Sequence, residues 1–357
     1  MISELKINNF KGLTKLNIQN FSRINLFGGK NNAGKTTILE ALFLFYDRLN
    51  PNMLIRQYNW RGMNEIPLKT ESLFAPIFNS FNLDKEIKIE ITEKGKSPEK
   101  MLIKYINDFS KSTAIIQGND NINNNFDDNF FSSSYLDIIF KNGKNPKQEL
   151  KIMINQNGLS LNVENGRPSE KQARFLSAKN NTHPNENAIL YGELDINGDT
   201  EVVLNFLRMI EPRLKSLTSI TLSNNMSLLY GDIGVGKKIP INYMGDGIGR
   251  VLTILLSIIS NKNGLVLIDE IDNGIHYTII PKVWDIISEV AEKYNCQIFA
   301  TTHSYECLAS AIDGISPDRH DEFRYIRVEN TEENNQIGKI FTYETLEVAI
   351  SNGWEVR

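Results

Sequence analysis

The sequence predicts an α/β protein with a mostly parallel central sheet, extended by an antiparallel β subdomain and a helical insertion. A strand, a glycine-rich turn and an apolar helix follow one another over residues 24–49. After residue 239, short apolar strands alternate with helices, and such alternation favours a parallel sheet. Residues 86–105 instead alternate apolar and polar positions on both sides of Gly95, which is typical of an antiparallel hairpin.

The composition is that of a soluble protein with a large core. Of the 357 residues, 41% are hydrophobic and 23% are charged, and this length favours about two domains. The net charge of −4 gives no overall basic footprint, so any DNA binding must use a local patch. Cys296 and Cys307 lack metal-ligand spacing, which favours a reduced, cytoplasmic setting. No apolar run approaches the ~20 residues that cross a bilayer and no signal peptide is visible, so we expect no membrane partner.

The first half of the chain predicts three strands, a helix and a hairpin. Strands are expected at 2–10, 16–18 and 24–27, a helix at 36–49, and the hairpin at 86–105. Residues 106–147 are rich in Asn, Asp and Ser, and predict a long, mobile insertion with weak structure. Strand-like alternation returns over residues 151–163. We place a first lobe at residues 1–165.

The second half predicts a helical insertion region at 166–238 and a second lobe at 239–357. Residues 200–217 have apolar side chains at helical spacing. The second lobe should contain helices at 249–260 and 279–293, strands at 265–268, 297–300, 323–328 and 339–343, and a last helix to residue 352. No heptad pattern is sustained, which excludes a long coiled-coil arm. The two lobes are expected to form one domain that is split in the sequence.

A glycine-rich loop before the first helix fits the pattern G-x-x-x-x-G-K-[ST] in full. Its residues are Gly29, Lys30, Asn31, Asn32, Ala33, Gly34, Lys35 and Thr36, and Thr37 follows. In such a loop the backbone N–H groups and the helix N-terminus point at phosphate oxygens. Lys35 is expected to reach the β- and γ-phosphates, and the Thr36 hydroxyl to bind Mg²⁺. An ordinary glycine loop is the alternative, but the strand–loop–helix context favours phosphate binding.

Two acidic residues, Asp269 and Glu270, follow the apolar run Leu265-Val266-Leu267-Ile268. A buried parallel strand reads as continuous apolar sequence, and ligand sites lie at the carboxyl ends of such strands. Asp269 is therefore placed to hold Mg²⁺, and Glu270 to polarise an attacking water. A strand that ends in two solvated acids is the alternative, which the phosphate loop makes less attractive.

A single histidine, His303, follows the next strand in the run Gln297-Ile298-Phe299-Ala300-Thr301-Thr302-His303-Ser304. Adjacent strands of a parallel sheet end at the same edge, so His303 should face the same site as the acid pair. A lone histidine is more often structural, and that reading is the alternative here.

A second glycine turn precedes the helix expected at 249–260. It comprises Met244, Gly245, Asp246, Gly247, Ile248, Gly249 and Arg250. Its amides and the helix N-terminus again favour an anion. Because one chain cannot place two phosphate loops on a single γ-phosphate, the turn implies a second copy of the chain. A plain glycine-rich helix entry is the alternative.

The order of phosphate loop, glycine turn, acid pair and histidine resembles that of the ABC-class ATPases, which are P-loop NTPases. Residues 244–248 resemble a divergent L-S-G-G-Q signature, Asn273, Gly274 and His276 resemble the D-loop, and His303 the switch histidine. The likeness covers residues 1–60 and 239–310. The form of these motifs resembles that in the branch with SMC, RecF and OLD-type proteins, in particular AAA-type anti-phage defence ATPases without a TOPRIM nuclease domain.

This resemblance implies a head-to-tail homodimer with two ATP molecules, each between the phosphate loop of one subunit and the signature of the other. It implies catalytic roles for Lys35, Glu270 and His303, with ATP and Mg²⁺ bound. It also implies that Phe10 and Lys11 lie near the nucleotide. There are two departures from the family pattern. Gly245 replaces the signature serine, and no glutamine stands out as the Q-loop ligand, although Gln57 is a candidate.

Three functions are compatible with this resemblance. The first is an ATPase switch that regulates a separate effector, such as a nuclease encoded nearby, in anti-phage defence. The second is a RecF- or SMC-like ATPase that binds DNA in repair or replication, for which Lys147, Lys151, Lys171, Arg174 and Lys179 are scattered candidates. The third is a transporter's nucleotide-binding subunit, which the divergent signature disfavours. The segment after His303 lacks an acidic cluster suited to a two-metal nuclease, so we expect no nuclease activity in the chain.

Overall fold

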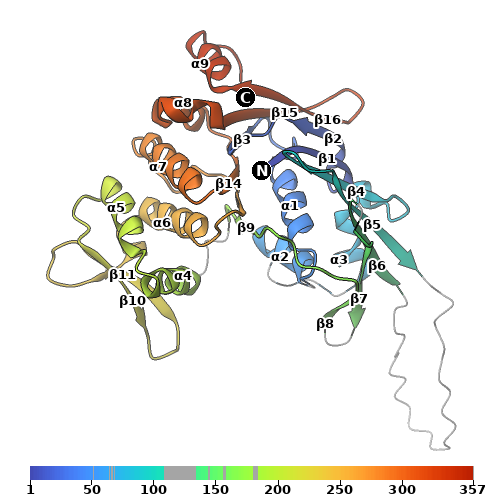
Figure 1. The fold of residues 1–357 in the computed structure, drawn as a ribbon, viewed down its shortest axis with the longest axis horizontal. Coiled ribbons are helices and arrows are strands. Elements are labelled where there is room, and N and C mark those ends of the chain that lie inside the picture. Colours follow the sequence, from blue (N-terminus) through green and yellow to red (C-terminus); the bar gives the residue numbers. More distant parts are fainter. Residues whose placement is uncertain are drawn as a thin grey trace, which may run out of the picture.

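The structure is a computed structural model that describes residues 1–50, 52–63, 65, 67, 69–107, 134–143, 145–155, 158–179 and 184–356. Most of the Asn-rich segment predicted to be mobile, residues 108–133, lies outside these ranges. Within them, three sheets and the helices that cover them form the fold (Figure 1).

A six-stranded sheet forms the centre of the molecule, and the sequence prediction of a mostly parallel sheet is confirmed. Four neighbouring pairs run parallel, and only the edge pair is antiparallel. In spatial order the strands are β16 (Gln336–Thr342), β15 (Phe323–Asn330), β3 (Ile24–Gly28), β14 (Gln297–Thr301), β13 (Leu265–Ile268) and β9 (Ala173–Leu176). The strands that carry the phosphate loop, the acid pair and the histidine are therefore direct neighbours.

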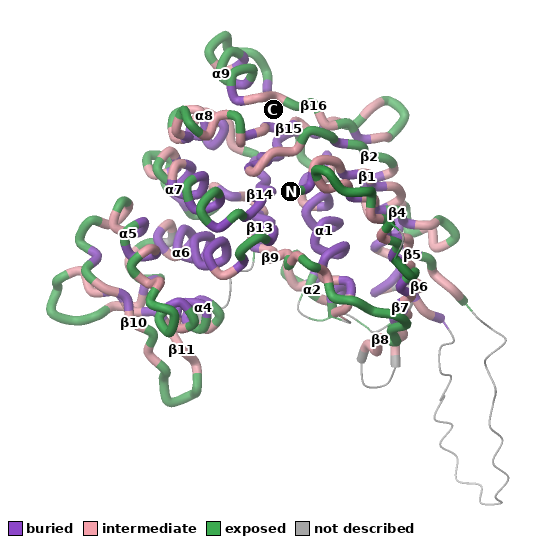
Figure 2. The backbone as a smooth tube through the Cα atoms, in the orientation of Figure 1, coloured by how far each residue is buried: buried purple, intermediate pink, exposed green. Residues whose placement is uncertain are grey.

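Each face of the central sheet belongs to a different hydrophobic core. In β13, Val266 and Ile268 pack with the core that contains α6 (Asp246–Ile259) and α7 (Ile280–Lys293). Leu265 and Leu267 pack with the core around α1 (Lys35–Tyr46). Alternate residues of a strand point to opposite faces, so a continuously apolar strand is buried on both sides. Figure 2 shows the central strands and both sets of helices as the most buried part of the chain.

A seven-stranded antiparallel sheet covers the outer side of α1. Its inner face carries apolar residues at every second position, such as Leu136, Ile138 and Phe140. In spatial order the strands are β2 (Leu13–Gln19), β1 (Ile2–Phe10), β4 (Ile87–Glu93), β5 (Glu99–Asn107), β6 (Ser134–Asn142), β7 (Gln148–Asn155) and β8 (Gly158–Glu164). The predicted hairpin at 86–105 is confirmed as β4 and β5.

One sequence expectation for this region is wrong. Residues 134–142 were expected within a weakly structured insertion, yet they form β6 and pair along nine positions with β5. Their alternating apolar residues are masked in the sequence by the Asn- and Ser-rich composition around them. The strand-like alternation over residues 151–163 falls in two paired strands, β7 and β8.

The region 166–238 contains strands as well as the expected helices. Its first strand, β9, completes the central sheet beside β13. Its helices are α4 (Pro184–Ile196) and α5 (Thr200–Ile210), and β10 (Ser216–Thr221), β11 (Ser227–Asp232) and β12 (Ile239–Pro240) form a small antiparallel sheet. The helix predicted over 200–217 ends at Ile210, because Glu211 precedes Pro212 and residues before proline disfavour helix.

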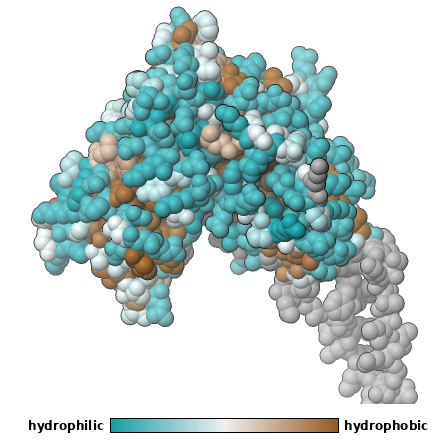
Figure 3. All heavy atoms as spheres, in the orientation of Figure 1, coloured by the Kyte–Doolittle hydropathy of each residue, from teal (hydrophilic) through white to brown (hydrophobic). Residues whose placement is uncertain are grey.

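The remaining helices lie at the ends of the two lobes. They are α2 (Met53–Trp60), the short α3 (Thr70–Leu73), α8 (Tyr305–Gly314) and α9 (Tyr343–Ser351). The sequence analysis did not identify α8, although Ser304 caps it by accepting a hydrogen bond from the Cys307 N–H. Within the described ranges, no helix is long and apolar enough to cross a membrane. Figure 3 shows a mostly hydrophilic face, indented between the α4–β10–β11 lobe and the antiparallel sheet.

Candidate nucleotide site

The phosphate loop connects β3 to α1 and depends on glycine at two positions. Gly29 has φ +123° and Gly34 has φ +95°, which L side chains rarely adopt. A Cβ on Gly29 would lie 2.3 Å from the Val328 carbonyl oxygen, and one on Gly34 would lie 2.5 Å from Leu13 Cδ2. Conformation and space both require glycine, so the loop is held in one shape by its neighbours.

Lys35 directs its ammonium group back into this loop. Its Nζ donates to the carbonyls of Gly29 at 2.7 Å and Lys30 at 3.0 Å, and the residue is only 4% exposed. Burial lowers the pKa of Lys35 to about 8, although the charges of Asp269 and Glu270 act in the opposite direction. A buried cation that has only carbonyl partners in a ring of glycine backbone fits a phosphate group well.

Thr36 and Asp269, expected from the sequence to share a metal ion, are in direct contact. The Thr36 hydroxyl donates to Asp269 Oδ1 at 2.8 Å, and the Thr301 hydroxyl donates to the same oxygen at 2.8 Å. Among the described residues, no group of three or more His, Cys, Asp or Glu side chains is placed to hold a metal. A hydroxyl and one carboxylate fit Mg²⁺, which usually takes few protein ligands and completes its shell with phosphate and water.

Glu270 and His303 lie next to this pair and face each other. His303 Nε2 is 3.9 Å from Glu270 Oε1, and both side chains are a little under half exposed. Glu270 has φ +48°, which is uncommon for a residue with a side chain, and its N–H donates to Thr301 Oγ1 at 2.8 Å. Burial and the Lys35 charge lower the pKa of His303 below its usual range, so its imidazole is neutral at pH 7.

Glu270 and His303 line an open pocket of about 600 Å³ at the carboxyl edge of the central sheet. Its lining residues are Asn31, Glu270, Asp272, Asn273, Gly274, His303 and Ser304. The structure therefore brings Asn31 of the phosphate loop, Glu270, the D-loop residues Asn273 and Gly274, and His303 to one place, whereas His276 is not part of this lining. Of the signature residues whose side chains the structure describes, Met244, Gly245 and Gly247 do not line the pocket.

The signature turn lies at the N-terminus of α6, beside the D-loop. A Cβ on Gly247 would lie 3.4 Å from the Gly274 carbonyl oxygen. Gly245 has φ +123° and ψ +142°, a conformation open almost only to glycine, which explains why this chain has no serine there. The Asn273 amide donates to the Ala178 carbonyl at 2.8 Å, and His276 Nδ1 lies 2.9 Å from the Thr278 hydroxyl.

The ammonium group of Lys11 forms an ion pair with the buried carboxylate of Glu40. Its Nζ lies 2.8 Å from Glu40 Oε2, and the same carboxylate accepts two 2.8 Å hydrogen bonds from Arg61. Phe10 is fully buried in the core around α1. Gln57 is also buried, and within the described residues its amide has no hydrogen-bond partner. The ammonium of Lys11 is thus held by Glu40, and its expected contact with nucleotide stays a prediction.

The sequence analysis missed two residues that shape this site. Thr301 bonds both Asp269 and the Glu270 N–H, and its signal was its place in the strand-end run of residues 297–304. Arg250 is buried in α6 and donates to main-chain carbonyls at the acid pair. Its position directly after the signature turn was the one feature of the sequence that pointed to it.

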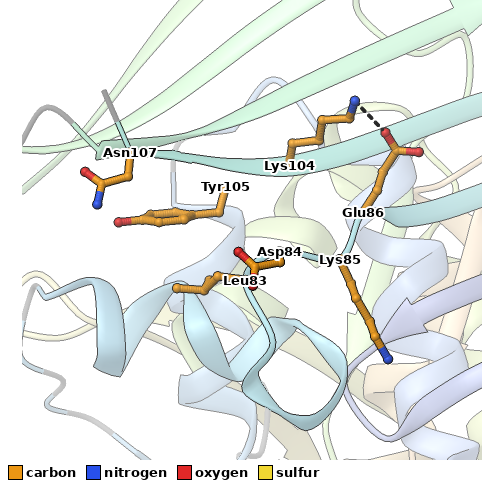
Figure 4. A pocket seen from close by; sticks show the side chains of 7 residues that line it. All are labelled: Leu83, Asp84, Lys85, Glu86, Lys104, Tyr105 and Asn107. Carbon is orange, nitrogen blue, oxygen red and sulfur yellow. Dashed lines mark ion pairs between the residues drawn. The ribbon is translucent and has the colours of Figure 1, made fainter. Parts of the chain in front are cut away.

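A second pocket, of about 620 Å³, lies at the edge of the antiparallel sheet (Figure 4). Its lining residues are Leu83, Asp84, Lys85, Glu86, Lys104, Tyr105 and Asn107. Lys104 pairs with Glu86 at 2.9 Å, and Lys88 pairs with the same carboxylate at 3.1 Å. It shares no residue with the nucleotide pocket, and its lining includes no glycine turn or acid pair suited to a phosphate group.

A phosphate loop, a strand-end aspartate on the loop threonine, a second acid and a histidine from the next strand together define a P-loop ATPase of the ABC class. Residues 24–309 match the family described as "AAA domain, putative AbiEii toxin, Type IV TA system", and the chain belongs to this family. The resemblance and the fold class inferred from the motifs are both confirmed, and the chain is an ATPase.

The chain is also similar to two curated proteins and to a solved structure. The chain is 24% identical over 328 residues to the ATP/GTP phosphatase of Helicobacter pylori, and the match covers 86% of each protein. A stretch of 45 residues, 13% of this chain, is 51% identical to the uncharacterized protein MJECL10 of Methanocaldococcus jannaschii and covers 20% of it. The Smc head domain of Pyrococcus furiosus, solved with the C-terminal domain of ScpA, is similar in structure, with a TM-score of 0.49, 12% identity and 99% of both chains covered.

Proposed function

We propose that this ATPase is a molecular switch that works as a head-to-tail homodimer and regulates a separate effector, such as a nuclease, in bacterial anti-phage defence. One observation carries the dimer: the pocket is lined by Asn31 of the phosphate loop, Glu270, D-loop residues and His303, but among the signature residues with described side chains Met244, Gly245 and Gly247 do not line it. The signature turn is built like an anion site at a helix N-terminus, with Gly245 in a conformation typical of glycine. A second copy would complete both half-sites.

Within each completed site, the described residues have separate roles. Lys35 and the loop amides bind the phosphates, and Thr36 with Asp269 would hold Mg²⁺, which neutralises charge on the transferred phosphoryl group. Glu270 would orient the attacking water, and neutral His303 lies 3.9 Å from it, close enough to orient the same water. Such chemistry needs positioning more than covalent catalysis, so hydrolysis should depend on the partner's signature.

The effector role is supported by the description of the family, which names a putative toxin of a Type IV TA system. A nucleotide-driven dimer is suited to control of an effector, because the open and closed states can bind a second protein differently.

A DNA-binding ATPase of the RecF or SMC kind is the alternative. The structure offers little basic surface at the positions considered for it. Lys147 pairs with Glu149, Lys171 with Glu93 at 2.6 Å, and Arg174 with Glu186 at 3.3 Å. Lys151 lies over the ring of Tyr135. Four of the five basic side chains considered, all except Lys179, therefore already have an acidic or aromatic neighbour, and this favours the switch.

The test is the Glu270→Gln variant with Mg-ATP. The variant keeps the side-chain shape but cannot polarise water, so we expect ATP binding within about twofold of wild type and turnover reduced on the order of 10²-fold or more. The stalled protein should sediment as a dimer. In lysate of the native host it should retain a stoichiometric second protein.

Glu322→Gln is a matched control, because Glu322 is a partly exposed carboxylate paired with Arg23 far from the pocket. It should behave like wild type. A fully active Glu270→Gln protein would contradict the catalytic role, and a monomer with bound ATP would contradict the dimer. DNA retained without a protein partner would favour the alternative, a DNA-binding ATPase of the RecF or SMC kind.

A further inference from the structure

Arg250 is a buried cation that bonds only to main-chain carbonyls. It is 8% exposed, and its Nη2 donates to the Asp269 carbonyl at 2.8 Å and to the Glu270 carbonyl at 3.4 Å. Its Nη1 donates to the Ser177 carbonyl, just after β9, at 3.1 Å. Its Nε is buried without a hydrogen-bond partner among the described residues, so the two Nη atoms carry its contacts, and the planar fork of a guanidinium suits several acceptors at once.

Arg250 contacts the main chain of Glu270, whose backbone conformation neighbouring residues must maintain. Glu270 has φ +48°, a conformation that is uncommon for a residue with a side chain and that neighbours must maintain. Thr301 holds it on one side by accepting the Glu270 N–H at 2.8 Å. Arg250 holds it on the other side through the two carbonyls. The direction of the Glu270 side chain therefore depends on both.

Arg250 also lies in the first turns of α6, directly after the signature turn. One rigid helix thus begins at the signature and, through Arg250, contacts the main chain of the acid pair in the same subunit. In a head-to-tail dimer the signature touches the partner's nucleotide, whereas the acid pair belongs to the subunit's own nucleotide. A displacement of α6 at one site would then move Glu270 at the other.

We propose that Arg250 is a positioning residue that fixes the main chain of Glu270 and couples it to the signature helix. Through this contact, occupancy of one ATP site is transmitted to the catalytic glutamate of the other. The first part stands on the contacts within one subunit, and the second rests on the proposed dimer.

The positioning role is tested on the nucleotide-free protein by hydrogen exchange. The amides of Asp269, Ile271 and Asn273 are hydrogen-bonded and should exchange slowly. Arg250→Lys keeps the charge but loses the fork, so these amides should exchange about tenfold faster. Turnover should fall on the order of tenfold to a hundredfold, with the affinity for a non-hydrolysable ATP analogue unchanged.

Arg208→Lys is the matched control, because Arg208 also donates to two carbonyls, those of Leu214 and Lys215, away from the site. It should change neither the exchange of residues 269–273 nor turnover. If Arg250→Lys does not fold, Arg250→Gln fills similar space without charge and gives the same comparison. Unchanged exchange and unchanged turnover in the folded variant would overturn the positioning role.

The coupling is tested in a mixed dimer. One subunit, isotopically labelled and carrying Lys35→Ala, offers only its signature, and a Glu270→Gln partner holds ATP. We expect ATP to protect residues 244–249 of the labelled subunit and also to slow exchange of its residues 269–273. With Arg250→Lys added to that subunit, only 244–249 should respond, and an unchanged response at 269–273 would overturn the coupling. If 244–249 never gains protection, the proposed dimer fails, whereas the nucleotide-free comparison still decides the role of Arg250.

Discussion

Lys35 is 4% exposed, and the hydrogen bonds described for its ammonium go to two carbonyls of its own loop. The carboxylates of Asp269 and Glu270 stabilise its charge but do not offset burial, and its pKa falls to about 8. A phosphate group would replace part of the lost hydration and favour the charged form. Lys35 is therefore already placed to bind an anion in the nucleotide-free protein.

This leads to a pH dependence of ATP binding. Below pH 8 Lys35 is mostly charged and binding needs no proton, whereas above pH 8 binding must take up a proton. Affinity should therefore weaken by up to about tenfold per pH unit above pH 8. Titration calorimetry at pH 8.5 in buffers of different ionisation enthalpy should detect uptake of up to one proton.

Lys35→Arg serves as the control, because arginine stays charged throughout this range. Its affinity should be weaker but flat between pH 7 and 9. A wild-type affinity that is equally flat, with no proton uptake, would contradict the lowered pKa.

At the scale of elements, Glu40 joins three segments that are far apart in sequence. It lies on α1, one helical turn after Thr36, and its fully buried carboxylate binds Lys11 after β1 and Arg61 after α2. Burial raises the pKa of Glu40, but Lys11 and Arg61 outweigh burial and leave that pKa below its usual value. The pairing fixes the helix that carries the phosphate loop against the antiparallel sheet.

Glu40→Gln should therefore destabilise the protein strongly. Removing one member of a buried ion pair leaves the other charges unpaired, and we expect the free energy of unfolding to fall by about 3 kcal/mol. Because the folded-state pKa of Glu40 is lowered, its contribution is present above pH 4.5 and lost as the pH falls through the folded value. The variant should thus lose part of the acid sensitivity seen below pH 4.5.

Urea unfolding at pH 7 and at pH 3.5 measures both effects. Glu322→Gln, which breaks the more exposed pair with Arg23, should cost less than about 1 kcal/mol. Equal losses in the two variants, or a Glu40→Gln loss that does not depend on pH, would contradict this role of Glu40.

At the scale of the whole molecule, the central sheet separates two hydrophobic cores and brings the site to its carboxyl edge. The phosphate loop belongs to the core around α1, whereas α6, which carries the signature, belongs to the other core. Met244, Gly245 and Gly247, the signature residues with described side chains, do not line the site pocket, so the proposed complete ATP site uses two subunits.

A mixture of two inactive variants should therefore regain activity. Lys35→Ala removes phosphate binding, and Gly247→Asp puts a carboxylate at the signature, where a Cβ has only an ordinary contact. In an equal mixture half of the dimers are mixed and each has one intact composite site, so turnover should recover to at most about a quarter of wild type, and the proposed coupling lowers it further because the second site stays empty. Steady-state phosphate release measures this.

The control mixes Lys35→Ala with the double variant Lys35→Ala/Gly247→Asp, which cannot form an intact site. It should stay inactive. Mixed dimers that form but show no turnover above this control would contradict sites built from two subunits.

The sequence by itself determined the local chemistry of this protein. The phosphate loop, the acid pair and the strand-end histidine were identifiable because each motif needs fixed residue types at short spacing, and apolar strands alternating with helices predicted the parallel sheet. Glycine at positions 29 and 34 follows from positive φ angles, which the sequence pattern already implied.

Only the tertiary structure decided which distant segments meet. That β9 completes the central sheet, that β6 continues the antiparallel sheet within an Asn-rich region, and that Lys11 binds Glu40 all depend on pairing across many residues. The role of Arg250 was hidden for the same reason, since its acceptors are main-chain carbonyls, which every residue has. Local spacing specifies which side chains are available, whereas burial and long-range pairing determine which of them act together.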